Sequence, residues 1–399
     1  MTSEIGIMNQ RGIALAADSA VTIGNAKVYN NAIKLFTLDS QHNIGIMIYG
    51  NANINGVPWE VVIKAYREEI KDGVEDHLED YKKSFINFIQ EKRELFPEVN
   101  NFLVNYYVID YLNILDSNFK NNIDLITKDS SPQELLNYIV DEYSNFIPQK
   151  GFAEKINESE FYADNGTSIE NYINSRFNFT IDKELNEKIQ KNIYNFLKSN
   201  NYLNDKTGVV FAGYGKKDYF PKINSFITDG LYSNILKFQE KVNADGKEYA
   251  GLYPFAQKDM VDTVINGIDP RLENYKDAEF ENIKKSIIDT VGSEDKEKIE
   301  NIFESGQNDF NKYRQENITS PIINMTENLS LDELAIMAET FVSLTSFKRK
   351  FSGDMQTVGG PVDVLVISKS DGPIWIKRKE YFNKEINEGY TLRRKWLRK

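Results

Sequence analysis

The chain has 399 residues, of which 41% are hydrophobic and 27% charged, a composition typical of a folded globular protein rather than a disordered one. Its formal net charge of -12 disfavours a nucleic-acid-binding surface, because phosphate contacts need concentrated positive charge. There is no cysteine and there are only two histidines, which excludes disulfides and thiolate or multi-histidine metal sites and disfavours a Ser-His-Asp triad.

No stretch approaches the ~20 apolar residues that a membrane span needs. The amino terminus also lacks the basic region and hydrophobic run of a secretory signal. We therefore expect a cytoplasmic protein that binds neither membrane nor nucleic acid and uses no cofactor. The basic cluster within residues 383–399 is interpreted as a solvated tail, and His42 and His77 as structural residues.

Residues 1–58 have the pattern of strands and tight turns. Isoleucine and leucine alternate with other residues on both sides of Asn9-Gln10-Arg11-Gly12, which predicts a β-hairpin. A third strand is predicted from Ile44 to Tyr49 and ends at Gly50. Its apolar run is nearly continuous, as expected for a strand that is covered on both faces.

Residues 59–205 have a helical pattern. A helix is predicted from Trp59 to Ile70, and a second is predicted from apolar residues spaced three and four apart: Val74, Leu78, Tyr81, Phe85 and Phe88. Further helices are predicted over residues 102–115, 132–146 and 181–197. This block is interpreted as a helical insertion.

Strands return within residues 206–256, over 208–215, 223–228 and 235–242, and Asp229-Gly230 predicts a hairpin turn between the last two. A second helical insertion is predicted over residues 257–329. Ser330 and Glu333 then form a capping-box pattern before another amphipathic helix. Two strands, over 362–367 and 374–377, close the last core block, residues 330–382.

The order of these elements decides the fold class. Blocks of strands separated by blocks of helices do not have the alternation of a parallel doubly wound sheet. The pattern predicts an α+β protein with two antiparallel sheets flanked by helices and interrupted by two helical insertions.

An enzyme without cysteine or a usable histidine needs another base to activate a nucleophile. An amino-terminal threonine supplies both groups, because its α-amine has a pKa of ~7.7 to 8.0 and can take the hydroxyl proton. Thr2 follows the initiator methionine, and a residue this small permits methionine removal. We therefore expect that Thr2 becomes the first residue without a self-cleaved propeptide.

The segment after Thr2 resembles the opening of proteasome beta subunits and their bacterial relatives. The shared features are Thr2-Ser3-Glu4-Ile5-Gly6-Ile7, Gly12-Ile13-Ala14-Leu15-Ala16-Ala17-Asp18-Ser19, Thr22, Gly24 and Lys34-Leu35-Phe36. The intervals of 16 and 32 residues from Thr2 to Asp18 and to Lys34 are those of the family. The resemblance implies a four-layer αββα sandwich, the N-terminal-nucleophile hydrolase fold.

The resemblance also implies roles for individual residues. Thr2 would be the nucleophile, Lys34 would stabilise its alkoxide, and Asp18 would hold that lysine. Gly50 matches the glycine whose amide forms the oxyanion hole. Residues near the family's substrate pocket are Val21, Thr22, Ala32, Ile48 and Ala52, which suggest an apolar preference.

A later segment, residues 351–364, resembles the family's Asp-x-x-Ser-Gly-Gly motif before a closing strand. Asp354 would match the acid that orients the threonine amine, and Thr357 the hydroxyl beside it. The motif departs from the family by one extra residue and by threonine in place of serine, so a turn-forming role of Asp354 stays open. The family's serine in a Gly-Ser-Gly context is missing, since the corresponding stretch is Ala250-Gly251-Leu252-Tyr253-Pro254-Phe255.

The sequence thus predicts a threonine peptidase that cleaves peptide bonds through an acyl-enzyme. The family implies a peptide or unfolded-protein substrate, a homo-oligomer and an ATP-dependent unfoldase as partner. Two alternatives stay open. One is a catalytically inactive scaffold that binds a partner, which the missing serine favours. The other is an amidase that acts on small molecules, since related folds cleave such amides.

Overall fold

The computed structural model describes residues 3–23, 27–38, 41–71, 73–96, 99–125, 131–147, 156–292, 295–352, 358–380, 382–383, 385–387 and 389. Two five-stranded sheets form its centre, and every strand pair in them is antiparallel. The fold is therefore α+β with antiparallel sheets, which confirms that part of the sequence prediction.

The first sheet is built around the amino-terminal hairpin. Its strand order is β12 (Gly251–Ala256), β1 (Glu4–Asn9), β2 (Gly12–Ala17), β13 (Asp363–Ser368), β14 (Gly372–Lys377). The second sheet has the order β11 (Ile235–Asp245), β10 (Lys222–Tyr232), β9 (Thr207–Gly213), β6 (Ile44–Gly50), β5 (Leu35–Thr37). Two short ribbons pair β3 (Val21–Ile23) with β4 (Lys27–Tyr29) and β7 (Asn53–Ile54) with β8 (Val57–Pro58).

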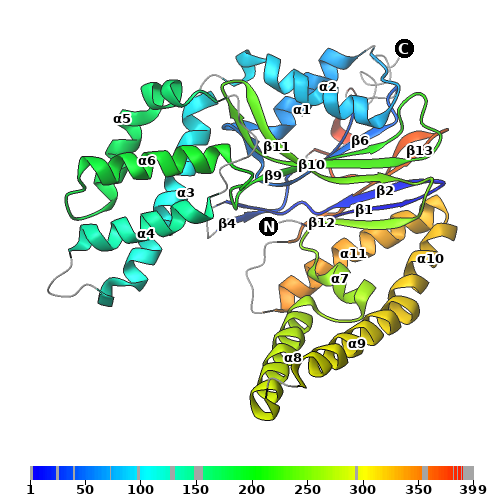
Figure 1. The fold of residues 1–399 in the computed structure, drawn as a ribbon. Coiled ribbons are helices and arrows are strands. Elements are labelled where there is room, and N and C mark those ends of the chain that lie inside the picture. Colours follow the sequence, from blue (N-terminus) through cyan, green and yellow to red (C-terminus); the bar gives the residue numbers. More distant parts are fainter. Residues whose placement is uncertain are drawn as a thin grey trace.

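The two sheets share a core of side chains from both of them. Leu15 and Leu365 of the first sheet belong to the same buried cluster as Met47 and Val210 of the second. Figure 1 shows the sheets stacked at the centre of the molecule. Burial on this scale excludes water between the sheets, so any charged group placed there needs a partner.

Helices cover the outer face of each sheet. Ile5 and Ile7 of the first sheet pack against α11 (Leu331–Phe351) and α7 (Asp259–Asn266), and α10 (Ser320–Asn328) contacts β1 and β12. Ile46 and Phe211 of the second sheet pack against α1 (Trp59–Ile70) and α2 (Leu78–Glu91). The same strands thus bury apolar side chains on both faces, as their continuous apolar runs predicted.

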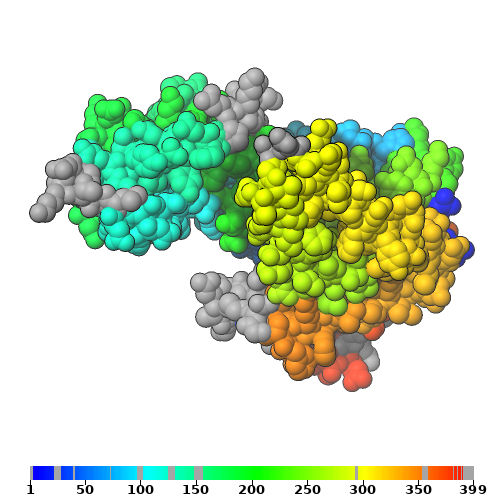
Figure 2. All heavy atoms as spheres, turned by 60° about the horizontal axis from the view of Figure 1, so that its bottom comes forward, coloured from blue at the N-terminus to red at the C-terminus, as the bar shows by residue number. Residues whose placement is uncertain are grey.

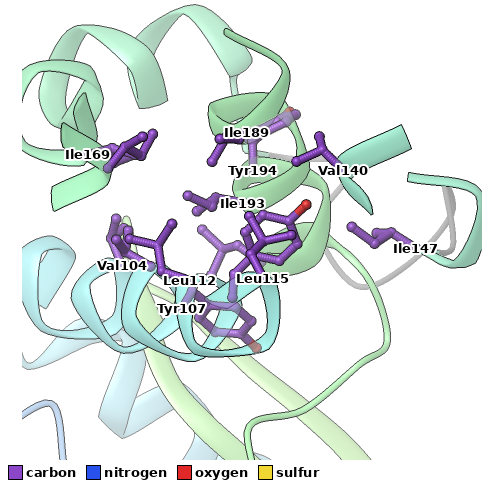
Figure 3. Packing of buried hydrophobic residues seen from close by; sticks show 14 of the residues in the cluster. Val104, Tyr107, Leu112, Leu115, Val140, Ile147, Ile169, Ile189, Ile193 and Tyr194 are labelled. Atoms are coloured by element: carbon purple, nitrogen blue, oxygen red, sulfur yellow. The ribbon is translucent and has the colours of Figure 1, made fainter. Parts of the chain in front are cut away.

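The first helical region extends from the edge of the second sheet (Figure 1). It contains α3 (Val99–Asn121), α4 (Pro132–Phe146), α5 (Glu158–Arg176) and α6 (Lys183–Lys198). These helices have their own apolar core, part of which Figure 3 shows around Tyr107, Leu112 and Ile193. The second region contains α8 (Pro270–Val291) and α9 (Lys296–Arg314), which extend away from the sheets at the bottom of Figure 1 and lie at the front of Figure 2 in yellow-green to yellow.

Helix starts were predictable where a cap is encoded locally. Ser131 caps α4 with a capping box, and the helix occupies the predicted residues 132–146. Ser330 and Glu333 form the predicted capping box of α11. The prediction that Val74 belongs to a helix is wrong, because α2 begins at Leu78 and Val74 is 42% exposed in the preceding loop.

The predicted hairpin turn at Asp229-Gly230 is also wrong. Both residues lie inside β10, and the chain reverses at Ser233-Asn234, whose φ angles are 47° and 62°. Tertiary contacts hold Asp229 in the strand: its carboxylate accepts hydrogen bonds from the Tyr107 hydroxyl at 2.5 Å and from the Leu203 amide at 3.1 Å. A long-range polar contact therefore overrides the local turn signal.

Candidate active site

Asp18 and Lys34 form a buried ion pair at the end of the first sheet. Asp18 directly follows β2, and Lys34 directly precedes β5 in the second sheet. The Lys34 ammonium lies 2.6 Å from Oδ1 of Asp18, and the two residues are 5% and 1% exposed. The Ile48 amide donates to the Lys34 carbonyl at 2.9 Å and so fixes the lysine backbone against β6. The sequence prediction brought these two residues together, and the geometry agrees with it.

The Asp18 carboxylate is held by three main-chain amides as well. Oδ1 accepts from the Ser3 amide at 3.0 Å, and Oδ2 accepts from Ala20 at 3.2 Å and from Gly359 at 3.0 Å. The Asp18 amide in turn donates to the Ser3 carbonyl at 3.1 Å. Four donors thus compensate the buried negative charge and give the carboxylate one orientation. They also tie the start of β1 to the ion pair.

Glu4 is a second acid at this site, and sequence reasoning missed its role. Its Oε1 lies 3.4 Å from the Lys34 ammonium, and the residue is only 1% exposed. Side chains alternate along a strand, so Glu4 faces the same side as Met8, which belongs to the core between the sheets. The alternation of Ile5 and Ile7 places Glu4 on the opposite face of β1 from them, but the sequence analysis assigned no role to this acid.

Gly50 ends β6 in a conformation that favours glycine. Its φ is 84°, and an added Cβ would lie 2.2 Å from the Lys206 carbonyl oxygen. The residue is exposed, so its backbone is open to an approaching molecule. A side chain here would strain the backbone and collide with the adjoining chain.

A pocket of about 150 Å³ adjoins Lys34 and Gly50. Four of the five predicted substrate residues line it: Val21, Ala32, Ile48 and Ala52. Pro58 and Trp59, which begin the first helical block, add further apolar surface, and Asn51, Asn53 and Glu60 add polar groups. The wall is therefore mainly apolar beside the lysine and polar toward its rim.

The remaining predicted site residues are Thr2, Thr22, Asp354 and Thr357. Thr2, Asp354 and Thr357 lie outside the described residues, and the Thr22 side chain lies outside them too. The backbone of Thr22 pairs with Val28 in the β3–β4 ribbon. The stretch that lacks the family's serine forms β12, the edge strand beside β1.

Both histidines have partners away from the pocket. His42 Nδ1 lies 2.8 Å from the Tyr81 hydroxyl, and His77 Nδ1 lies 2.8 Å from a carboxylate oxygen of Asp218. Asp218 also accepts from the Leu78 and Gly215 amides. These contacts anchor α2 to the second sheet. Within the part of the chain that the structure describes, no three histidine or acidic side chains gather as metal ligands would.

No helix among the described residues combines the length and apolar character needed to cross a membrane. No protein-family model matches the sequence, and no curated protein matches it. Solved structures that match include a Gly-1 mutant of Anbu from Hyphomicrobium sp. strain MC1, at 11% identity and a TM-score of 0.35, covering 100% of this chain and 97% of that chain. Another is Anbu (ancestral beta-subunit) from Yersinia bercovieri, at 10% identity and a TM-score of 0.29, covering 99% and 95% of the two chains. Similarity at these TM-scores carries no argument about activity.

Proposed function

We propose that this protein is an N-terminal threonine hydrolase with the four-layer αββα fold, which cleaves peptide bonds with Thr2 as its nucleophile. The observation that supports this most is the bonding around Ser3. The residue joined to Thr2 exchanges two hydrogen bonds with Asp18, and the same carboxylate holds the buried Lys34 ammonium. A threonine freed at this position is thereby joined to a backbone that contacts the ion pair directly.

The proposed reaction uses the charges at this site. The α-amine of Thr2 accepts the hydroxyl proton, and the hydroxyl oxygen attacks the carbonyl carbon of the scissile amide. Lys34 stabilises the developing alkoxide, while the 2.6 Å ion pair with Asp18 holds the ammonium in place. The Gly50 amide donates to the carbonyl oxygen as it becomes an oxyanion.

Collapse of the tetrahedral intermediate breaks the C–N bond, and the leaving amine takes the proton from the α-amine. An ester between the acyl group and Thr2 remains, and water hydrolyses it. The pocket lined by Val21, Ala32 and Ile48 would hold the residue before the cleaved bond, so we propose a preference for apolar side chains there. A peptide or unfolded chain, presented by a homo-oligomer and an ATP-dependent unfoldase, remains the predicted substrate.

The proposal also assigns the blocks of the chain. Residues 1–58, 206–256 and 330–382 supply the two sheets and α11, while residues 59–205 and 257–329 supply the helical blocks. Because α1 and α2 pack on the second sheet, they would form the outer layer of the sandwich. The insertion proper would then consist of α3 to α6.

The test combines intact-mass measurement with hydrolysis of fluorogenic peptides that carry leucine or alanine before the reporter. We expect a mass without Met1, and a loss of at least about 100-fold in kcat/KM for Thr2→Ala and for Lys34→Met. Lys82→Met is the matched control, since Lys82 is 2% exposed and pairs with Glu240 at 2.7 Å away from the pocket. Its activity should stay near that of the wild type.

Four outcomes would contradict the peptidase. Retained Met1 would block the amine and exclude the mechanism. Hydrolysis that survives Thr2→Ala must come from another site. Cleavage of small amides but not of peptides would identify an amidase, and a freed Thr2 without any hydrolysis would identify a scaffold.

A further inference from the structure

We propose that Glu4 is a positioning residue for the proposed threonine hydrolase: its buried carboxylate shares the Lys34 ammonium with Asp18 and opposes deprotonation of the amine that acts as the base. Hydrolysis then begins at a higher pH than it would without Glu4. This inference rests on the proposed function, because it concerns the amine that acts there as the base.

The contacts around Glu4 form one continuous group. Glu4 Oε1 lies 3.4 Å from the Lys34 ammonium, which lies 2.6 Å from Asp18 Oδ1, which accepts from the Ser3 amide at 3.0 Å. All of these groups are buried, with the Glu4 side chain 0% and the Lys34 side chain 6% exposed. Charges interact more strongly in such surroundings than in water, so Glu4 attracts the Lys34 ammonium strongly.

Other elements also face this end of the space between the sheets. Glu4 lies opposite Ala17 in β2, and Ala17 lies opposite Asp363 in β13. The Asp363 carboxylate forms an ion pair with Lys379, whose ammonium donates a hydrogen bond to it. Its charge is therefore paired outside the Glu4–Lys34–Asp18 group.

Tyr49 of β6 reports the charge of Glu4. Burial raises the pKa of Tyr49 to about 12, and the negative charge of Glu4 contributes to the same shift. The ring packs over Gly208, where an added Cβ would collide with it, and its centroid lies 5.9 Å from that of Phe255. These contacts fix the position of the ring, so the pKa of Tyr49 can be used to detect the charge of Glu4.

The consequence for catalysis follows from the sign of the charge. A carboxylate favours the protonated form of a nearby amine, so Glu4 would oppose the α-amine that must accept a proton. The family-like pair of Asp18 and Lys34 needs only one acid. The second acid, Glu4, therefore raises the pH at which the α-amine loses its proton and can act as the base.

Glu4→Gln keeps the shape of the side chain and removes the charge. With the fluorogenic leucine peptide as probe, kcat/KM is measured from pH 5 to pH 9 for wild type and variant. We expect the acid limb to move down by about one pH unit. Glu4→Asp, which restores the charge, should return the acid limb toward the wild-type position.

Asp218→Asn is the matched control. Asp218 is a buried acid that pairs with Lys222 at 2.9 Å, away from the pocket, so this variant should lose stability and keep the wild-type acid limb. An acid limb of Glu4→Gln that coincides with the wild type would overturn the proposal, whatever the change in melting temperature. Should Glu4→Gln fail to fold, Glu4→Met removes the same charge and is judged by the same shift.

A second measurement separates this inference from the proposed function. In protein labelled with 13C-tyrosine, NMR titration should show a lower pKa for Tyr49 in Glu4→Gln than in the wild type. Absence of any hydrolysis would contradict the proposed function. The Tyr49 titration would then still test whether Glu4 is charged. An unchanged Tyr49 titration would show that Glu4 carries no charge there and would overturn the proposal.

Discussion

The two helical regions bury their apolar side chains to very different extents. In the first, α3 to α6 share a core in which Tyr107, Leu115 and Ile193 are essentially inaccessible to water. In the second, neither α8 nor α9 contains a buried residue, and Ile283 and Ile287 are 42% and 37% exposed. Both regions have helical periodicity in the sequence, so periodicity alone does not tell whether a helix belongs to a core.

The attachment of the two regions differs in the same way. Buried polar contacts hold the first region on the second sheet: the Lys237 ammonium of β11 donates to the Tyr107 hydroxyl of α3 and to the Asn201 carbonyl. The second region is held by partly exposed ion pairs, in which Lys348 of α11 lies 3.0 Å from both Asp259 and Asp269. A partly exposed ion pair contributes little to the free energy of unfolding. Removing one partner of a buried pair costs much more, because the other charge is left buried without a partner.

The largest expected effect is on the buried contact of the first region. Lys237→Met leaves the Asp229 carboxylate buried without its ammonium and should lower the free energy of unfolding by about 3 to 5 kcal/mol. Lys276→Met in α8 is the control, since its ammonium lies over the Phe310 ring at 4.1 Å on a partly exposed face. Urea unfolding followed by circular dichroism measures both. Equal losses would show that the buried contacts of Lys237 contribute no more to stability than the partly exposed contact of Lys276.

Truncation of one side chain in each region tests the cores. Ile193→Ala removes a fully buried side chain and should cost about 3 kcal/mol, because the cavity closes only in part. Ile287→Ala on α8 should cost less than about 1 kcal/mol, because its side chain is already in contact with water. Thermal unfolding compares the two variants. A large loss for Ile287→Ala would mean that another surface covers α8 in solution.

The pH dependence of stability sharpens the comparison further. Burial lowers the pKa of Lys237 to about 8. An unfolded lysine titrates near 10.5, so the unfolded chain binds more protons between these values and the folded state gains stability as pH rises through them. We expect the stability difference between wild type and Lys237→Met to change by on the order of 2 kcal/mol from pH 7 to pH 10. Lys276→Met should show no such change relative to the wild type.

The candidate site could be predicted only in part. The resemblance of the amino-terminal segment to proteasome beta subunits predicted that Asp18 and Lys34 lie together, and β6 ends at Gly50 as predicted. Glu4 was missed because its contact depends on how two sheets stack, which no local pattern encodes. Asp229 was misread for the same reason, since its partners Tyr107 and Leu203 are distant in sequence.

The sequence by itself determined most of the strands, most of the helices and the caps of α4 and α11, because these depend on periodicity and on contacts a few residues apart. Only the tertiary structure decided that Lys34 is shared by two acids, that β10 continues past Asp229 and that one helical region has a core while the other does not. Those features depend on which surfaces of the sheets and helices pack together and so become inaccessible to water. That exclusion arises when segments far apart in the chain pack together.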